Sequence, residues 1–330
     1  MNIAPVHVDA LRALGYTEEE ARFLYIVATH SGYFVARQFL AFTDAHWGGR
    51  TTSFWNKPYA KSHARADRFP ESGTVYHLFS RQLYRQINRE NIRNRREHEI
   101  EFIRRRIAML DFVLLNPGNQ YLETEPEKVR FFSGKLNIQN HYLPTKLCLG
   151  KTPCASARYF VDKFPMFFSP SSPVVTFTYI DEGAVIFTNF VRHLKGYLPL
   201  FRQLSEFQFV YASQTDSNFE KVMEIFSSLV KIPLESKVAC DLVHYFRVRK
   251  AWEEKQYAAV TDADLIFRNQ ARAKFAGERF EGLYRGWKKG QVSEIGIRQE
   301  VGTNDRKHTV GFATFLLRRI APCEDSAKSD

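Results

Sequence analysis

The pattern of apolar and polar positions predicts three helices and a β-hairpin within the first eighty residues. Thr17 and Glu20 have the spacing of a helix-capping box, and apolar positions then recur at helical spacing to about residue 30. Further helices are expected over residues 34–42 and from Arg50 onward, although Pro58 is unfavourable inside a helix. Alternating runs at residues 63–69 and 74–79 flank a turn rich in Pro and Gly and predict the hairpin.

Three helices followed by a hairpin is the order of a winged helix-turn-helix, which we expect over residues 1–80. In that fold the third helix enters the major groove of DNA, and the hairpin, or wing, contacts the backbone. The expected contacts to bases and phosphates are Arg50, Thr51, Thr52, Ser53, Asn56 and Lys57 on the helix, and Lys61, Arg65 and Arg68 on the wing. The alternative is a small helical domain whose charges are only solvated.

Residues 81–116 are expected to form a basic, mostly helical connecting segment. Four arginines recur at intervals of four residues and would share one face of a helix, with a break near Asn94. They are Arg81, Arg85, Arg89 and Arg93. Such a face repels itself unless an anion binds, so we expect Arg81, Arg85 and Arg89 to contact phosphates. The alternative is a solvated face that nearby glutamates balance.

A turn-forming segment at residues 116–119 indicates a domain boundary. Residues 117–231 then read as strands at 158–168 and 174–180, a helix at 186–204, a strand at 207–212 and a helix at 217–229, which is typical of an α/β layer. Residues 232–330 are expected to form a basic helical extension that ends in a hairpin made by residues 292–301 and 309–320. The predicted fold class is a multidomain α+β protein.

Composition and charge narrow the choice of partner. The 330 residues are 44% hydrophobic and 25% charged, as in ordinary globular proteins. The longest uncharged run contains three prolines, so we expect a cytoplasmic protein without a membrane segment. The net charge is +11, and residues 46–96 alone hold 11 basic and 3 acidic residues. This segment favours an anionic partner, and about six phosphate contacts there would be ordinary for DNA binding.

Four short segments resemble a known family. After the expected winged helix, the chain carries RYFVD at 158–162, TFTYIDEG at 176–183, LKGYL at 194–198 and FQFVYA at 207–212. In this order they resemble the replication-relaxation family of bacterial mobile elements and plasmids, over residues 15–229. The resemblance implies a winged helix joined to a degenerate restriction-endonuclease-like domain of the PD-(D/E)XK type.

The resemblance also raises the question of nuclease activity. Active members of that superfamily use two acidic residues and a lysine to hold Mg²⁺ and position the attacking water. The candidates here are Asp162, Asp181, Glu182 and Lys195. Tyr179 stands where the second acid is expected, and no lysine follows Asp181 two positions on. We therefore expect the three acidic residues to lie at strand ends and to have no catalytic role. A metal-dependent nuclease, with Lys195 as the replacement lysine, is the alternative.

The sequence therefore predicts a sequence-specific double-stranded DNA-binding protein of bacterial or mobile-element type. It would regulate transcription or the replication or transfer of a plasmid or mobile element, with a second copy of itself and replication or transfer proteins as candidate partners. A protein-interaction module is a further alternative. No cofactor and no metal are expected, because no phosphate-binding glycine motif is present and the spacing of His141, Cys148 and Cys154 matches no common zinc pattern.

Overall fold

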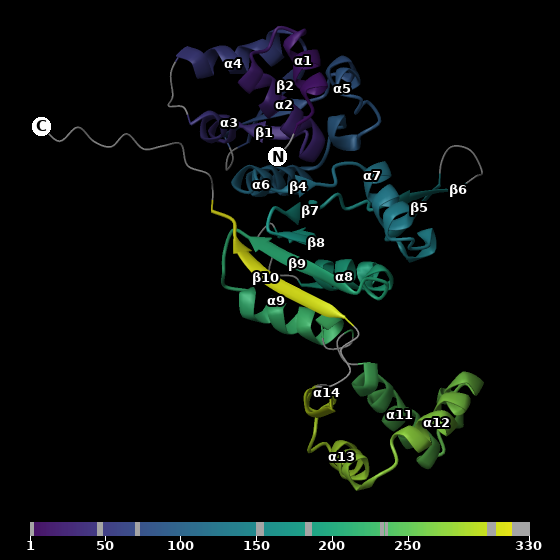
Figure 1. Cartoon of the computed structure of the whole chain (residues 1–330). Helices are drawn as coiled ribbons and strands as arrows, with labels where there is room; N and C mark the ends of the chain where they lie inside the picture. The colour runs from purple at the N-terminus through teal and green to yellow at the C-terminus, as the bar shows by residue number, and fades with distance from the viewer. Residues whose placement is uncertain are drawn as a thin grey trace, which may run out of the picture. The chain divides into compact units, whose positions relative to one another are not determined.

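The chain has a mixed α+β architecture (Figure 1). The structure, a computed structural model, describes residues 3–44, 49–69, 73–149, 155–181, 187–231, 234, 237–301 and 308–318. It divides into two compact units. The first comprises Met1–Phe187, Gln208–Asn218 and Ala313–Asp330, and the second comprises Thr188–Phe207 and Phe219–Phe312.

The N-terminal part combines helices with a small antiparallel sheet of order β1-β3-β2. Its elements are α1 (Pro5–Arg12), α2 (Glu18–His30), β1 (Tyr33–Val35), α3 (Ala36–Thr43), α4 (Gly49–Ala60), β2 (Ala64–Phe69) and β3 (Gly73–Leu78). The predicted hairpin is confirmed as β2 and β3, and the predicted capping box of Thr17 and Glu20 starts α2. The second helix begins later than expected, because residues 33–35 pair with β3 before the chain turns into α3.

An aromatic core fixes α4 in the first unit. The Phe54 ring stacks on Phe39 with centroids 3.8 Å apart, and the neighbouring Trp55 stacks on Tyr76 of β3 at 5.7 Å. Pro58 lies inside α4, although a proline is unfavourable within a helix. It is buried in the last turn, where only two helical residues follow it, and its carbonyl accepts the backbone N–H of His63 as the chain leaves the helix.

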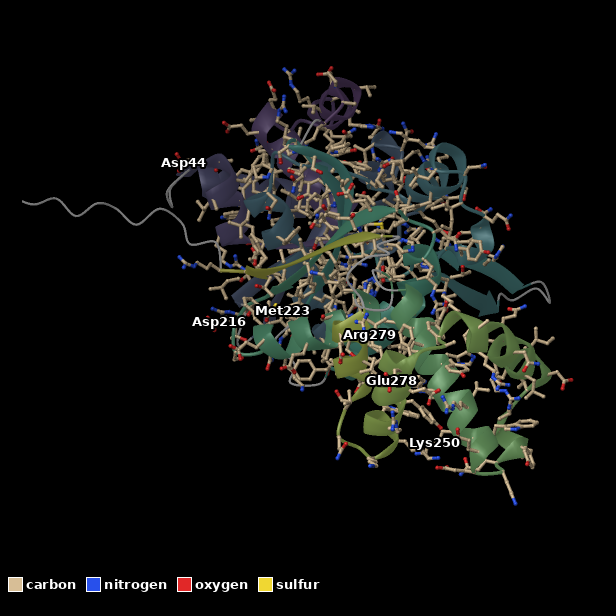
Figure 2. The ribbon with its side chains drawn as sticks, turned by 60° about the horizontal axis from the view of Figure 1, so that its bottom comes forward. Asp44, Asp216, Met223, Lys250, Glu278 and Arg279 are labelled. Atoms are coloured by element: carbon tan, nitrogen blue, oxygen red, sulfur yellow. The ribbon has the colours of Figure 1, made fainter. Side chains whose placement is uncertain are left out.

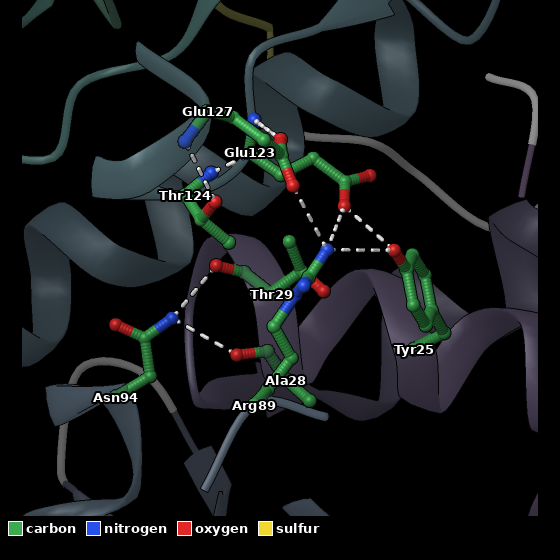
Figure 3. Close-up of polar contacts among 8 residues, drawn as sticks. All are labelled: Tyr25, Ala28, Thr29, Arg89, Asn94, Glu123, Thr124 and Glu127. Atoms are coloured by element: carbon green, nitrogen blue, oxygen red, sulfur yellow. Dashed lines mark hydrogen bonds and ion pairs between the residues drawn. The ribbon is translucent and has the colours of Figure 1, made fainter. Parts of the chain in front are cut away.

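The connecting segment is not one long helix. It consists of α5 (Arg81–Gln86), the 3₁₀ turn η1 (Arg93–Arg95) and α6 (Ile100–Leu115). Asn88 adopts a left-handed conformation with φ 56°, so the four regularly spaced arginines do not share a helical face as predicted. The expected break near Asn94 is confirmed: the Asn94 amide donates to the carbonyls of Ala28 and Thr29, both at 2.9 Å, and so caps the end of α2 (Figure 3).

Close packing at this cap explains a glycine. Gly32, just after α2, has φ 85°, and a Cβ atom there would lie 2.2 Å from the Asn94 carbonyl oxygen. Only glycine fits both the backbone conformation and the approach of the η1 segment.

A five-stranded sheet of order β10-β9-β8-β7-β4 follows. Its strands are β4 (Gln120–Tyr121), β7 (Met166–Ser169), β8 (Ser172–Ile180), β9 (Glu206–Ser213) and β10 (Thr309–Leu316). β8 pairs antiparallel with β7 and parallel with β9, and the connection between β8 and β9 contains α8 (Thr188–Phe201). The predicted order of strand, strand, helix, strand and helix is confirmed here, with α9 (Phe219–Phe226) and the π-helical turn η4 (Ser227–Lys231) after β9.

The segment between β4 and β7 holds α7 (Glu125–Val129), the π-helical turn η2 (Arg130–Lys135), the 3₁₀ turn η3 (Asn140–Tyr142) and a separate hairpin of β5 (Thr145–Leu149) with β6 (Ala155–Tyr159). The strand predicted over residues 158–168 is wrong as one element. Phe160 and Lys163 have φ values of 49° and 59°, so the chain turns between β6 and β7, and Asp162 lies in that turn.

The C-terminal part is helical, as predicted, but its predicted hairpin is wrong. The helices are α11 (Lys237–Glu253), the 3₁₀ turn η5 (Tyr257–Ala259), α12 (Asp262–Lys274), α13 (Glu278–Lys288) and α14 (Glu294–Val301). Ile297 of α14 is fully buried with Phe246, Phe275 and Tyr284, which favours a helix over a strand. β10 instead extends the large sheet alongside β9, with hydrogen bonds from Thr309 N to Ser205 O and from Leu317 N to Ser213 O.

Cation–aromatic and backbone contacts hold these C-terminal helices together. Lys250 of α11 lies over the Trp287 ring, with Nζ 5.5 Å from its centroid, and Arg279 of α13 donates to the Glu300 carbonyl at 3.0 Å; Lys250 and Arg279 are labelled in Figure 2.

In the described part of the chain, no helix is both long and apolar enough to cross a membrane.

Candidate nucleic-acid interface

The solvent-facing residues of α4 and of the β2–β3 hairpin form the candidate interface. Asn56 is exposed on α4, and Lys61 and Arg68 are exposed on the turn and strand that follow. Neither Lys61 nor Arg68 forms an ion pair with any described residue. Their charges are therefore available to an external anion.

Two other predicted contacts are already paired within the protein. The Lys57 ammonium lies 2.8 Å from Glu20 Oε1, and Glu20 is a buried residue that also accepts the backbone N–H of Thr17 in the capping box. Arg65 pairs with Glu97 at 2.6 Å and with Asp67 at 3.3 Å. A phosphate would have to compete with these carboxylates, so Lys57 and Arg65 offer less positive charge than the sequence suggests.

The first turn of α4 carries four more predicted contacts. Arg50, Thr51, Thr52 and Ser53 belong to the helix Gly49–Ala60, but their side chains lie outside the described part of the structure.

The three arginines predicted after the hairpin have different environments. Arg81 is exposed and forms no ion pair with a described residue, whereas Arg85 lies 3.5 Å from Glu90. The Arg89 side chain is 13% exposed and its Nη2 donates to Glu123 at 2.7 Å and to the Tyr25 hydroxyl oxygen at 3.2 Å (Figure 3). Arg89 joins α2 to the segment before α7, so its charge is paired within the protein.

Sequence reasoning missed an exposed aromatic residue at the same surface. Tyr59 of α4 is 66% exposed and lies three positions after Asn56, a spacing that places both on one helical face. That spacing was available in the sequence. An exposed tyrosine on the same helical face as an exposed amide is suited to contacts with a sugar or a base edge.

The residues considered for nuclease chemistry do not form a described metal site. Asp181, at the end of β8, is 9% exposed and accepts a 2.5 Å hydrogen bond from the Tyr211 hydroxyl. Asp162 lies in the turn before β7, Lys195 is exposed on α8, and Glu182 lies outside the described residues. Where side chains are described, no three His, Cys, Asp or Glu residues gather as metal ligands.

We expect the purified chain with Mg²⁺ or Mn²⁺ to leave both duplex and single-stranded DNA intact. The reason is that the Asp181 carboxylate is engaged by Tyr211, while Asp162 is held on a turn rather than on a neighbouring strand. Gel analysis of supercoiled plasmid would detect single nicks. Metal-dependent nicking that Asp162→Ala and Lys195→Ala each abolish would contradict this prediction.

Comparisons with known proteins do not assign the chain to a family. No family model, no curated protein and no solved structure matches this chain. The resemblance to the replication-relaxation family stays a prediction.

Proposed function

We propose that the protein binds double-stranded DNA in a sequence-specific manner through α4 and the β2–β3 hairpin. The supporting observation is the element order α2, β1, α3, α4, β2, β3, which is the order of a winged helix-turn-helix, combined with exposed, uncompensated cations on or next to the hairpin. In this proposal α4 enters the major groove and the hairpin contacts the backbone. Those cations are Lys61, Arg68 and Arg81.

The packing around α4 supports a rigid recognition element. Its inner face is held by Phe54 and Trp55 in the aromatic core, which leaves Asn56 and Tyr59 on the outer face. A side chain held on a rigid helix loses little conformational freedom on binding, so base contacts from Asn56 would be specific.

The biological role is proposed from the resemblance. By that resemblance the protein would control transcription, or the replication or transfer of a plasmid or mobile element, with its sheet domain acting as a degenerate PD-(D/E)XK-like scaffold. Self-association and contact with replication or transfer proteins are part of this proposal.

Salt dependence tests DNA binding directly. If Lys61, Arg68 and Arg81 each neutralise one phosphate, the slope of log affinity against log salt is about −2.7, which weakens binding about 40-fold between 50 and 200 mM salt. Six contacts would give about −5, but Lys57, Arg65, Arg85 and Arg89 are paired inside the protein. Fluorescence anisotropy with random duplex DNA measures the slope, and a slope near zero would favour a protein-interaction module instead.

Substitutions on the helix and on the hairpin should have different effects. Asn56→Ala should change the preferred base at one position, by about 1–3 kcal/mol in discrimination, whereas Arg68→Ala should weaken binding to all sequences alike. Selection of bound sequences from a random duplex pool, repeated for each variant, measures both effects. Arg12→Ala, an exposed α1 residue that pairs with Asp9, is the control. Altered preference in Arg68→Ala alone would mean that the hairpin reads the bases.

A further inference from the structure

The first unit contains a cavity that the DNA-binding proposal does not use. Its volume is about 610 Å³, within the range of about 300–1,000 Å³ that small-molecule sites occupy. It is lined by the end of α2 at Thr29 and His30, by residues 88–89 and 91–93, by residues 122–130 around α7, and by residues 158–161 and 163–165 from the end of β6 onward. Four segments that are distant in sequence thus form one cavity.

Basic side chains outnumber acidic ones in its walls. Six basic side chains and three glutamates line the cavity: Arg89, Arg93, Lys128, Arg130, Arg158 and Lys163, with Glu123, Glu125 and Glu127. All three glutamates are engaged, since Glu123 and Glu127 face Arg89 and Glu125 pairs with Arg158 at 3.0 Å. Arg93, Lys128, Arg130 and Lys163 form no ion pair with any carboxylate that the structure describes.

The two lysines are held inside the wall by neutral acceptors. Lys128 is 4% exposed and donates to the Phe164 carbonyl at 3.1 Å, and Lys163 donates to Asn94 Oδ1 at 3.0 Å. When protonated, each side chain has three donors, of which one is used here, so further acceptors can be added. Burial, together with the nearby charges of Arg106 and Arg93, lowers the pKa of Lys163 to about 6. Burial also lowers the pKa of Lys128 to about 8, against the opposing effect of Asp162.

Three polar atoms of the lining residues are buried without a hydrogen-bond partner among the described atoms. They are Thr29 Oγ1, His30 Nε2 and Arg89 Nε. Thr29 and His30 are 5% and 7% exposed, and burial lowers the pKa of His30 to about 3, so its ring is neutral. Buried polar groups in native proteins are nearly always paired, so these three atoms beside the cavity are exceptions among the described atoms.

The remaining wall is apolar. Ile92, Leu122, Phe160 and Phe164 line the cavity, and Lys128 lies over the Phe160 ring with Nζ 5.9 Å from its centroid. A ligand with several negative charges and a flat apolar part would match this division of the wall.

We propose that this cavity binds a phosphorylated small molecule of mononucleotide size, with its phosphates facing Arg93, Lys128 and Lys163 and its flat part against Phe160 and Phe164. The site is separate from α4 and the hairpin, and its ligand is recognised without any contact to DNA. Failure of the DNA-binding proposal would therefore leave this one unaffected.

Calorimetric titration of the full chain tests the proposal with three probes: ATP, AMP and pyrophosphate, at constant ionic strength. ATP should bind saturably and more tightly than pyrophosphate, because it also covers the apolar wall. Arg93→Gln and Lys163→Met should each weaken ATP binding about tenfold or more, the loss expected for one charged hydrogen bond. Arg12→Gln, which removes an exposed arginine that pairs with Asp9 outside the cavity, should leave binding unchanged.

Proton uptake provides a second readout. An anion should raise the pKa of Lys163, which is mostly neutral at pH 7.5, so ATP binding should take up protons, and the measured heat should vary with the ionisation enthalpy of the buffer. The charged groups around Lys163 and Lys128 are Arg93, Arg106, Arg158, Glu125, Glu127 and Asp162. Lys163→Met should abolish most of this uptake.

Several results would overturn the proposal. No saturable binding of any probe would do so, as would equal weakening by Arg12→Gln. Displacement of ATP by a tighter-binding 5′-phosphorylated single-stranded oligonucleotide would assign the cavity to nucleic acid instead. If the loss of the Asn94 contact prevents Lys163→Met from folding, Arg93→Gln decides alone, because the described Arg93 side chain makes no hydrogen bond within the protein.

Discussion

Replacing Arg89 by leucine should lower the free energy of unfolding by about 3–5 kcal/mol, the usual effect of breaking a buried ion pair from one side. Glu123 is 12% exposed and, among the described residues, would keep only the Tyr25 hydroxyl as a donor to its carboxylate. The loss arises from the charge left without its partner, so the double variant Arg89→Leu with Glu123→Leu should recover much of the stability. Urea unfolding followed by circular dichroism measures all three values.

Arg85 provides the matched control, four residues before Arg89. Its side chain is 64% exposed and lies 3.5 Å from Glu90, so Arg85→Leu should change stability by about 1 kcal/mol or less. Under conditions where both variants are folded, Arg89→Leu should bind DNA within about twofold of the unchanged protein. A large loss of DNA affinity with unchanged stability would restore Arg89 as a phosphate contact.

Replacing Asp111 by alanine should destabilise the protein by about 3 kcal/mol or more. Asp111 of α6 is 1% exposed and accepts two hydrogen bonds from Arg37, at 2.7 and 2.8 Å, and one from Gln38 Nε2 at 2.7 Å. These bonds join α3 to α6, so their loss separates the helix that precedes α4 from the connecting segment. Chemical unfolding measures the change.

Two variants show whether burial sets the size of this effect. Asp111→Asn retains an acceptor for Gln38 and should lose less than alanine does. Asp67→Ala removes an exposed carboxylate on β2 that lies 3.3 Å from Arg65, and should cost less than about 1 kcal/mol. Equal losses for Asp111→Ala and Asp67→Ala would show that the α3–α6 contact contributes nothing beyond a surface pair.

Much of the candidate interface could be predicted from local pattern. The capping box at Thr17, the β2–β3 hairpin and the helix α8 appear where spacing places them. The exposed positions of Asn56, Lys61 and Arg68 also agree with the expected surface. Such features depend on contacts a few residues apart, which periodicity and turn residues encode directly.

The local elements and the excess of positive charge follow from the sequence alone. Which of these charges remain available to an external anion depends on the packing of distant segments. Arg89 looked like Arg81, but its partner Glu123 is 34 residues away and the Tyr25 hydroxyl is 64 residues away. Likewise, the sequence predicts β10 as half of a hairpin. In the structure it instead lies beside β9, about a hundred residues earlier in the chain, and belongs to the large sheet. Periodicity reports which face of an element is apolar but not which distant segment covers it, so the pairing of buried charges and the edge of the sheet follow only from the packed chain.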